Sequence, residues 1–315
     1  MTPRRLCVTA VSLNTALDRT LRVERLRPGA VHVAAAECLG AGGKAVNVAR
    51  ALLALGVEAR IVGLAGGAVG RSVRDLARGE GLPARWFPTD GATRVCTIVV
   101  DPENGATVLN GRGPVVAPLA VISLEAYLFR RAARGDAIAL TGSLPPGLPV
   151  DLYARWGDRC RALGAALVAL DAHGAVLAAG LRSVPDVVKV NREEFARTAP
   201  GESLAGRARA LLRSGVGLVV VTQGEDGAVA FAPDGAWRVP AARVAAVNPT
   251  GSGDVFLAGL LAGRAHGLPL SEALALAAAA AALNAARLGP GPDDLASARA
   301  LARTLSPERL PADGG

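Results

Sequence analysis

One aspartate follows a glycine-rich turn in the last third of the chain. Gly251, Ser252 and Gly253 lead into Asp254, and the apolar residues from Val255 onward predict a helix. N–H groups at a helix start lack intrahelical partners and lie at the positive end of the helix dipole, so such a turn binds anions. A carboxylate beside a phosphate can take a proton from an attacking hydroxyl, as phosphoryl transfer requires. Taken alone, the stretch is equally compatible with an ordinary glycine turn.

A second glycine segment precedes a predicted helix near the N-terminus. Gly42, Gly43 and Lys44 come first, and Asn47 follows about one helical turn later. Free amides, an ammonium and a side-chain amide together can hold a sugar hydroxyl or a phosphate. The segment is not a Walker A loop, because no Gly-Lys-Ser/Thr with the required upstream glycine occurs in the chain.

Lysine is rare in this protein. Among 35 basic residues only Lys44 and Lys189 are lysines, and the others are arginines. A lysine that is kept against such a bias indicates a place where a compact ammonium is preferred to a planar guanidinium. Two residues are also compatible with chance.

Strand and helix patterns alternate along most of the chain. Apolar runs predict buried strands at 6–13, 61–64, 137–140, 166–170, 186–190 and 217–222. Helical patterns between them predict a mainly parallel sheet that is covered on both faces. Asp18 lies in the polar loop after the first strand, where open α/β sheets bind ligands, so it is a candidate for contacting a substrate hydroxyl. An Asx-type turn is the equal alternative.

Two segments interrupt the alternation. Residues 93–100 and 107–110 predict a hairpin, and residues 21–39 look extended. We expect a single domain over residues 1–315, with a small β lid formed by about 15–40 and 92–114. Arg94 opens the hairpin, either as a phosphate contact or as a solvated edge-strand arginine.

Composition narrows the functional classes. A chain of 315 residues that is 51% hydrophobic can bury a large core. Its net charge of +8 comes from scattered arginines and aromatic residues make up only 3%, so no nucleic-acid partner is expected. Residues 273–286 are too few to span a bilayer and no signal-peptide pattern opens the chain, so we expect a cytoplasmic protein without a membrane partner. The four cysteines form no CxxC pair, which argues against a zinc or dithiol site.

The motifs together resemble those of the ribokinase-like, PfkB-type carbohydrate kinases, in the branch that contains 1-phosphofructokinase and tagatose-6-phosphate kinase. One family signature is similar to the segment from Gly42 to Asn47, and a second is similar to the segment from Asn248 to Gly259. Residues 141–147, 191–194 and 222–227 resemble the family's Gly-Ser-Leu-Pro-Pro-Gly loop, its Asn-x-x-Glu element and its nucleotide loop. The resemblance implies a three-layer α/β/α sandwich with a small β-sheet lid, through which a homodimer is expected.

The resemblance also implies an activity. ATP would donate its γ-phosphoryl group, with Mg²⁺, to a hydroxyl of a phosphorylated ketohexose of the fructose 1-phosphate or tagatose 6-phosphate type. Asp254 would be the general base, and the amides of Gly251, Ser252 and Gly253 would stabilise charge on the transferring group. The positions matched to the sugar are Asp18, Gly43, Lys44, Asn47, Arg94 and Ser143. Those matched to ATP are Lys189, Thr222, Gly224, Gly227 and Asn284, and those matched to the metal, through water, are Asn191 and Glu194.

Two points leave alternatives open. Asn284 is the polar residue of an alanine-rich helix. Its side-chain amide either contacts adenine or forms a hydrogen bond to its own helix. Residues 29–33 lack the basic residue with which relatives reach a sugar phosphate, and Arg112 or His32 would have to replace it. A kinase for an unphosphorylated sugar or nucleoside is therefore the first alternative, and a non-catalytic sugar-phosphate sensor is the second.

Overall fold

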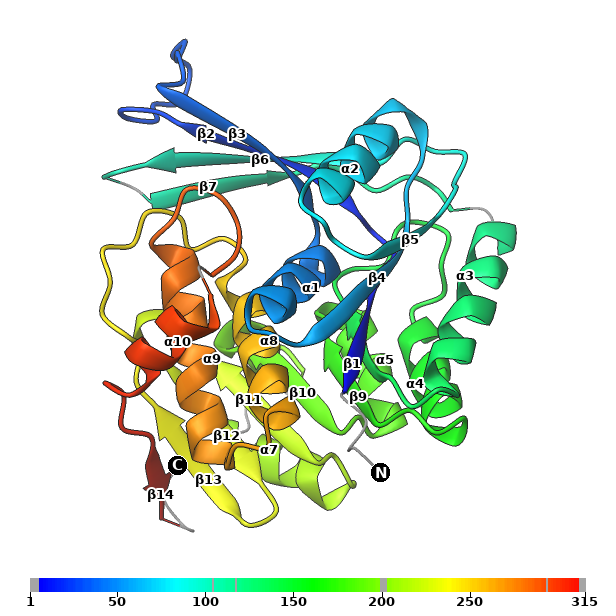
Figure 1. The fold of residues 1–315 in the computed structure, drawn as a ribbon, viewed down its shortest axis with the longest axis vertical. Coiled ribbons are helices and arrows are strands. Elements are labelled where there is room, and N and C mark those ends of the chain that lie inside the picture. Colours follow the sequence, from blue (N-terminus) through cyan, green and yellow to red (C-terminus); the bar gives the residue numbers. More distant parts are fainter. Residues whose placement is uncertain (1–5, 104, 117, 199–202, 293, 312–315) are drawn as a thin grey trace.

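The computed structural model describes residues 6–103, 105–116, 118–198, 203–292 and 294–311. They form a large sheet that helices cover on both faces, and a smaller separate sheet (Figure 1). The predicted three-layer α/β/α architecture is confirmed.

The large sheet is mainly parallel. Its order within the described residues is β14-β13-β12-β11-β10-β9-β8-β1-β4-β5, and the strands from β11 to β5 run parallel to their neighbours. The other three pair antiparallel at one edge. The bounds are β1 (Cys7–Ser12), β4 (Glu58–Leu64), β5 (Ala84–Phe87), β8 (Ala137–Thr141), β9 (Leu167–Asp171), β10 (Val187–Asn191), β11 (Leu218–Thr222), β12 (Ala228–Ala232), β13 (Gly235–Val239) and β14 (Glu308–Leu310). The central strands are buried on both faces, which explains their continuous apolar runs.

Each face of this sheet has its own apolar core. One core joins the sheet to α1 (Lys44–Ala54), α2 (Gly67–Gly79), α8 (Ser252–Ala265), α9 (Leu270–Ala285) and α10 (Leu295–Ala302). The other joins it to α3 (Pro118–Ala132), α4 (Leu152–Ala162), α5 (Gly174–Gly180), α6 (Arg192–Ala196) and α7 (Leu204–Arg213). The helices α1 and α8 that begin at the two glycine segments therefore share one face.

Helices α8 and α9 pack closely because the side chains between them are small. A Cβ atom added to Gly259 would lie 2.6 Å from the Cα atom of Ala277, and one added to Gly263 would lie 2.5 Å from the Cβ atom of Ala273. The alanine-rich sequence of α9 thus serves close helix packing. It fixes α8, the helix that begins with the Asp254 turn, against the rest of the domain.

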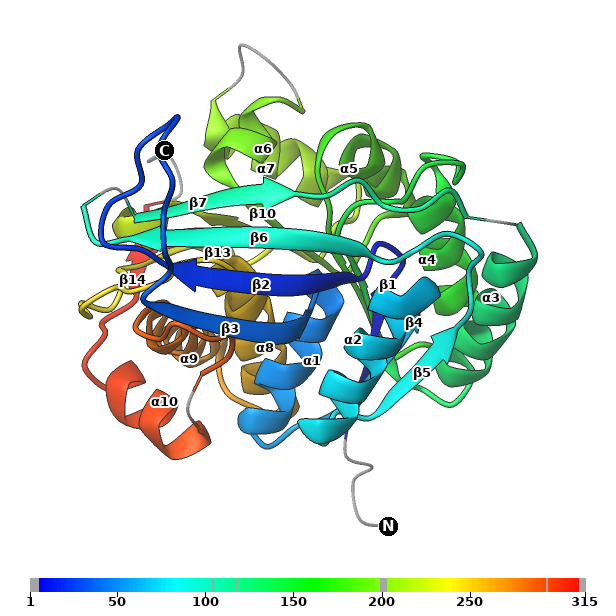
Figure 2. The same cartoon turned by 90° about the horizontal axis from the view of Figure 1, so that it is seen from above.

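The smaller sheet has the order β3-β2-β6-β7 in the described residues. Its strands are β2 (Ala16–Arg22), β3 (Ala36–Gly42), β6 (Arg94–Asp101) and β7 (Gly105–Asn110). The predicted hairpin is present, since β6 and β7 pair antiparallel. Only residues 13–15 separate β1 from β2, so the smaller sheet extends from the carboxyl end of the large one and lies across it in the view from above (Figure 2).

Several parts differ from the predictions. Strand β14, close to the C-terminus, was not predicted; it pairs with the open edge of β13, where unpaired backbone groups are available. Strand β5 and helix α3 were not predicted. No described helix is both long enough and apolar enough to cross a bilayer.

Candidate active site

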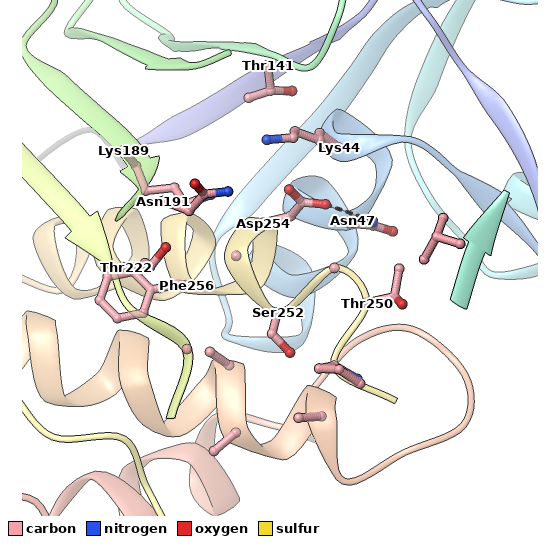
Figure 3. A pocket seen from close by; sticks show the side chains of 18 of the residues that line it. Lys44, Asn47, Thr141, Lys189, Asn191, Thr222, Thr250, Ser252, Asp254 and Phe256 are labelled. Carbon is pink, nitrogen blue, oxygen red and sulfur yellow. Dashed lines mark hydrogen bonds between the residues drawn. The ribbon is translucent and has the colours of Figure 1, made fainter. Parts of the chain in front are cut away.

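The carboxyl ends of neighbouring parallel strands meet at one cavity of about 1280 Å³. Ser12 ends β1, Thr141 ends β8, Asn191 ends β10 and Thr222 ends β11, and all four line it. The start of α8 and part of the smaller sheet complete the wall (Figure 3). Ligands of open α/β sheets bind at this position.

Almost every predicted site residue lines this cavity. The residues that do so are Asp18, Gly43, Lys44, Asn47, Arg94, Ser143, Lys189, Asn191, Glu194, Thr222, Gly224, Gly227, Gly251, Ser252, Gly253 and Asp254. Asn284 is the exception. Segments that are far apart in the sequence are therefore brought together on one surface.

The turn before α8 has the expected anion-binding geometry in part. Gly251 has a φ of 81°, which favours glycine, and its carbonyl accepts from the Asp254 amide at 2.9 Å. The amides of Gly251 and Gly253 have no partner within the described residues. The Ser252 amide was predicted to be open as well, but it donates to the Pro249 carbonyl at 3.1 Å because the turn folds back there. Two donors of the turn remain for an anion.

Asp254 is buried, with 6% of its surface exposed, and its Oδ2 accepts from the Asn47 side-chain amide at 2.9 Å. Burial raises the pKa of this carboxyl, and the charge of Asp171 adds to the rise, whereas Lys44 and Lys189 oppose it. A carboxylate with a raised pKa is a stronger base than an exposed one. It faces the cavity beside the open amides (Figure 3).

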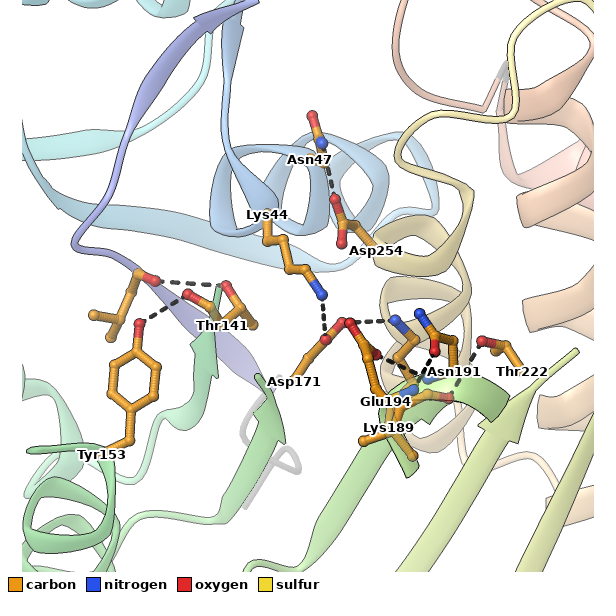
Figure 4. Close-up of polar contacts among 12 residues, drawn as sticks. Lys44, Asn47, Thr141, Tyr153, Asp171, Lys189, Asn191, Glu194, Thr222 and Asp254 are labelled. Carbon is orange, nitrogen blue, oxygen red and sulfur yellow. Dashed lines mark hydrogen bonds and ion pairs between the residues drawn. The ribbon is translucent and has the colours of Figure 1, made fainter. Parts of the chain in front are cut away.

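Both lysines of the chain bind a single buried carboxylate. Lys44 Nζ donates to Asp171 Oδ1 at 2.6 Å, and Lys189 Nζ donates to Asp171 Oδ2 at 2.8 Å (Figure 4). Although burial alone would raise the pKa of Asp171, the two ammoniums lower it. Burial works against the charge of Lys44, but Asp171 and Asp254 outweigh it and raise the pKa of the ammonium. A Cβ atom on Gly253 would lie 2.8 Å from Lys189 Nζ, so this ammonium lies against the turn before α8. Positive charge is therefore held beside that turn.

One end of the cavity lies under the smaller sheet. Asp18 on β2 has a pKa of about 6, raised by burial and by Asp254 against the opposing charges of Arg50 and Arg94. Arg94 Nε donates to the Asn14 carbonyl at 3.1 Å, and the Asn14 side-chain amide donates to Ser143 Oγ at 2.8 Å. Carboxylate, hydroxyl and guanidinium groups here are suited to a polyhydroxylated, anionic ligand.

The other end of the cavity follows β10 and β11. Asn191 and Glu194 form a capping box at the start of α6: the Glu194 amide donates to Asn191 Oδ1 at 2.7 Å, and the Asn191 amide donates to Glu194 Oε2 at 3.0 Å. Gly227 has a φ of 86°, and a Cβ atom there would lie 2.1 Å from the Val239 carbonyl oxygen, so only glycine fits. Thr222, Gly224 and residues 240–244 line this end.

Asn284 and the two predicted replacements for the missing basic residue, Arg112 and His32, do not line the cavity. Asn284 is 1% exposed, and its amide donates to the Thr250 carbonyl at 3.1 Å and to Ser252 Oγ at 3.0 Å. These bonds tie α9 to the turn. Arg112 is exposed and does not line the cavity, and the His32 ring lies 3.0 Å from the Arg27 carbonyl oxygen, away from the cavity lining.

Sequence reasoning missed two residues that organise the site. Asp171 follows the predicted strand 166–170 but was not named as a site residue, although the two rare lysines both pair with it. Arg50 was not singled out: it contacts Asn47 on its own helix, and its contact with Glu80 joins α1 to the end of α2, which no local pattern connects.

Comparison with known proteins gives one consistent result. The model of the pfkB family of carbohydrate kinases matches residues 8–296. A 1-phosphofructokinase of Rhodobacter capsulatus is 37% identical over 315 residues, which cover 96% of this chain and 98% of that protein. A 1-phosphofructokinase of Haloferax volcanii is 34% identical over 276 residues, with 85% of this chain and 87% of that protein covered. The crystal structure of a possible 1-phosphofructokinase of Thermotoga maritima has the same fold, with a TM-score of 0.87 at 22% identity over 97% of this chain and 100% of that one. This chain belongs to the pfkB family of carbohydrate kinases.

Proposed function

We propose that this protein transfers the γ-phosphoryl group of ATP to a hydroxyl of a phosphorylated ketohexose, with fructose 1-phosphate as the first candidate and tagatose 6-phosphate as the second. One observation carries the proposal: the buried Asp254 carboxylate lies beside the open amides of Gly251 and Gly253 in a single cavity. One end of that cavity lies under the smaller sheet and the other follows β10 and β11. The names of the relatives at 37% and 34% identity support the choice of sugar phosphate.

The roles follow from the contacts. Asp254 accepts the proton of the attacking hydroxyl, and the amides of Gly251 and Gly253 stabilise charge on the transferring group. Asp18 accepts hydrogen bonds from sugar hydroxyls, with Gly43, Asn47 and Ser143 around it. Lys189, Thr222, Gly224 and Gly227 contact ATP. The role of Asn284 in adenine binding stays a prediction, and its contacts support a further role in fixing the turn.

Mg²⁺ is the divalent metal that we propose to accompany ATP. Asn191 and Glu194 would hold it through water, and it would neutralise charge on the phosphates. Oxygen donors are what this ion prefers, and Glu194 Oε1 has no partner among the described residues. No group of three or more His, Cys, Asp or Glu side chains in the described residues could hold a metal. This agrees with a metal that enters with the nucleotide.

Arg94 is the residue that we propose for the phosphate already carried by the sugar. Its Nε and Nη1 donate to the carbonyls of Asn14 and Gly111, at 3.1 and 3.4 Å, which fixes the guanidinium at the cavity wall under the smaller sheet. Lys44 was matched to the same phosphate, but its ammonium is engaged with Asp171.

Formation of ADP tests the function directly. Purified protein with ATP and Mg²⁺ is incubated separately with fructose 1-phosphate, fructose 6-phosphate and tagatose 6-phosphate, and with fructose, tagatose, ribose and adenosine. Turnover with a phosphorylated ketohexose supports the proposal. The absence of a lysine or arginine over residues 29–33 favours the alternative, a kinase for an unphosphorylated sugar or nucleoside. Turnover with that second panel alone would establish it, and ADP formation with neither panel, despite sugar-phosphate binding, would point to a sensor.

We further propose that the smaller sheet is a lid that pairs two copies of the chain. Val31 and Val33 are 98% and 90% exposed, and on the smaller sheet Leu39 and Leu109, which lie in one row across the strands, are 49% and 61% exposed. Analytical ultracentrifugation should show a dimer for the natural chain and a monomer for Leu39→Glu with Leu109→Glu. Leu119→Glu, at an exposed leucine on α3, is the matched control and should leave the dimer intact. A monomeric natural chain would exclude the pairing.

A further inference from the structure

We propose that Arg50 is a positioning residue of the phosphoryl-transfer reaction: it fixes the direction of the Asn47 side-chain amide, and through that amide it orients the Asp254 carboxylate. The inference rests on the proposed function. Arg50 itself does not line the cavity.

Arg50 is held by contacts from three directions. It lies on α1 with 9% of its surface exposed. Its Nε and Nη2 donate to the two carboxylate oxygens of Glu80 at 2.6 and 3.1 Å, and Nη2 also donates to the Ala41 carbonyl at 2.6 Å. Nη1 donates to Asn47 Oδ1 at 3.0 Å. The guanidinium is therefore clamped before any substrate binds.

The chemistry of these groups decides which way the Asn47 amide points. A guanidinium carries donors only, so the group of Asn47 that faces Arg50 must be the carbonyl oxygen. The NH₂ group then faces Asp254 and donates to Oδ2 at 2.9 Å. In the reverse orientation the amide oxygen would face a carboxylate and the NH₂ group would face a guanidinium, so two favourable contacts would become repulsive. Arg50 thus excludes the orientation in which Asp254 loses its donor.

Lysine cannot replace Arg50 in this role. One ammonium lacks the planar fork that reaches Glu80, Ala41 and Asn47 at the same time. It does retain the positive charge that acts on Asp18. Arg50→Lys should therefore remove the orientation of the Asn47 amide while keeping the positive charge at position 50.

The inference has a consequence for proton affinity at Asp254. The groups that act on this carboxyl are Lys44 on α1, Asp171 at the end of β9 and Lys189 on β10, in addition to the Asn47 amide. The amide lowers the pKa of Asp254, whereas burial, the largest effect, raises it. The charge of Asp254 in turn raises the pKa of Asp18 on β2. When the amide is free to turn, the pKa of Asp254 should rise further, and the carboxylate should be less often in the ionised form that accepts a proton.

A double-mutant cycle tests the inference. We would measure kcat and KM for ATP and fructose 1-phosphate in the natural chain, Arg50→Lys, Asn47→Ala and the double variant. Arg50→Lys should lower kcat roughly 10- to 100-fold, the size expected when a hydrogen bond to a charged group is lost, with the KM for ATP unchanged. In the Asn47→Ala background the same change should have little effect, because Arg50 acts through Asn47. Equal losses in both backgrounds, or no loss at all, would overturn the proposal.

Three further measurements make the result unambiguous. Glu80→Gln weakens the clamp while keeping Arg50, so it should lower kcat in the same direction by less, and it replaces Arg50→Lys in the cycle if that variant does not fold. Arg78→Ala, at an exposed Arg78–Asp75 pair on α2, should leave kcat unchanged. Carboxyl NMR titration of ¹³C-labelled aspartates needs no turnover: the Asp254 titration should move to higher pH in Arg50→Lys and not in the Asn47→Ala background. If no sugar phosphate is turned over, the proposed function fails while the titration still decides the role of Arg50.

Discussion

The Lys44 ammonium lies 2.6 Å from Asp171 Oδ1, a contact between the first turn of α1 and the end of β9. The same carboxylate holds Lys189 at 2.8 Å and is completely buried. Both lysines of this arginine-rich chain are therefore held by one carboxylate. Helix α1 and strand β10, which both line the cavity, are thereby joined at the end of β9.

Replacing Asp171 should destabilise the fold. Asp171→Asn keeps the size of the side chain but removes the carboxylate with which two ammoniums form ion pairs, and Lys189 is buried. We expect the free energy of unfolding at pH 7 to fall by about 3 to 5 kcal/mol, as when one partner of a buried pair is removed. Urea denaturation of both proteins would measure it.

The same comparison should depend on pH. Since the pKa of Asp171 is lowered from its ordinary value of 3.8, its contribution to stability is fully present above that value and is lost as pH falls through the folded-state pKa. The difference between the two proteins should accordingly shrink in acid. Asp75→Asn, at an exposed pair with Arg78, is the control and should change the unfolding free energy by less than about 1 kcal/mol. A similar effect at both positions would contradict a special role for Asp171.

Removing the charge of Asp254 should abolish most turnover. Asp254→Asn retains the shape of the side chain but cannot accept a proton, so kcat should fall about 10²- to 10⁴-fold. Binding of ATP, measured by calorimetry, should be largely kept because the glycine-rich end of the cavity is untouched. Unchanged turnover would remove Asp254 from the role of base.

Activity should decline in mildly acidic solution. The pKa of Asp18 is raised to about 6, so this carboxylate gains a proton as pH falls through that value. Burial also raises the pKa of Asp254, so this carboxylate too is protonated at a higher pH than an exposed aspartate. Because both act in the ionised form, kcat/KM for the sugar phosphate should fall with a log–log slope approaching about 2, as two interacting sites titrate. In Asp18→Asn, which binds sugar more weakly, the slope should approach about 1. A flat profile between pH 5 and 7 would be inconsistent with these positions for the carboxyls.

Two glycines on β3 offer a matched pair of substitutions. A Cβ atom on Gly42 would lie 2.1 Å from Asp18 Cγ, whereas one on Gly40 would meet only Pro290 at an ordinary 3.8 Å. Gly42→Ala should therefore displace the Asp18 carboxylate and raise the KM for the sugar phosphate roughly tenfold or more, the factor that corresponds to about 1.4 kcal/mol of binding energy. Gly40→Ala should leave this KM near its natural value. Similar steady-state constants for the two variants would show that Asp18 does not contact the sugar.

The parts of the site that depend on residues close together in the sequence could be predicted from the sequence. The glycine turn before α8 and the placement of Asn191 and Thr222 at strand ends follow from local rules about helix starts and parallel sheets. The hairpin of β6 and β7 followed in the same way from two apolar runs and a turn. Family resemblance then supplied roles for these positions.

The contacts between distant segments could not be predicted. Asp171 can bind both lysines only because the fold places the end of β9 beside Lys44 and Lys189. Arg50 can bind Glu80 only because the fold places the end of α2 beside α1. Asn284 was matched to the nucleotide by the family resemblance, but its contact with the Thr250 carbonyl depends on how α9 packs on α8 and could not be predicted. Strand β14 likewise formed because an open edge was available, not because its own residues favour a strand.

The bond between Asn47 and Asp254 joins residues 207 positions apart. During synthesis on the ribosome, the first glycine segment emerges long before α8, and a chain that lacks α8 has neither the proposed base nor the open amides. Contacts of such wide sequence separation are made late and slow the folding of a domain. A growing or prematurely ended chain can therefore fold its first strands without acquiring the means to consume ATP, and activity appears only once the protein is nearly complete.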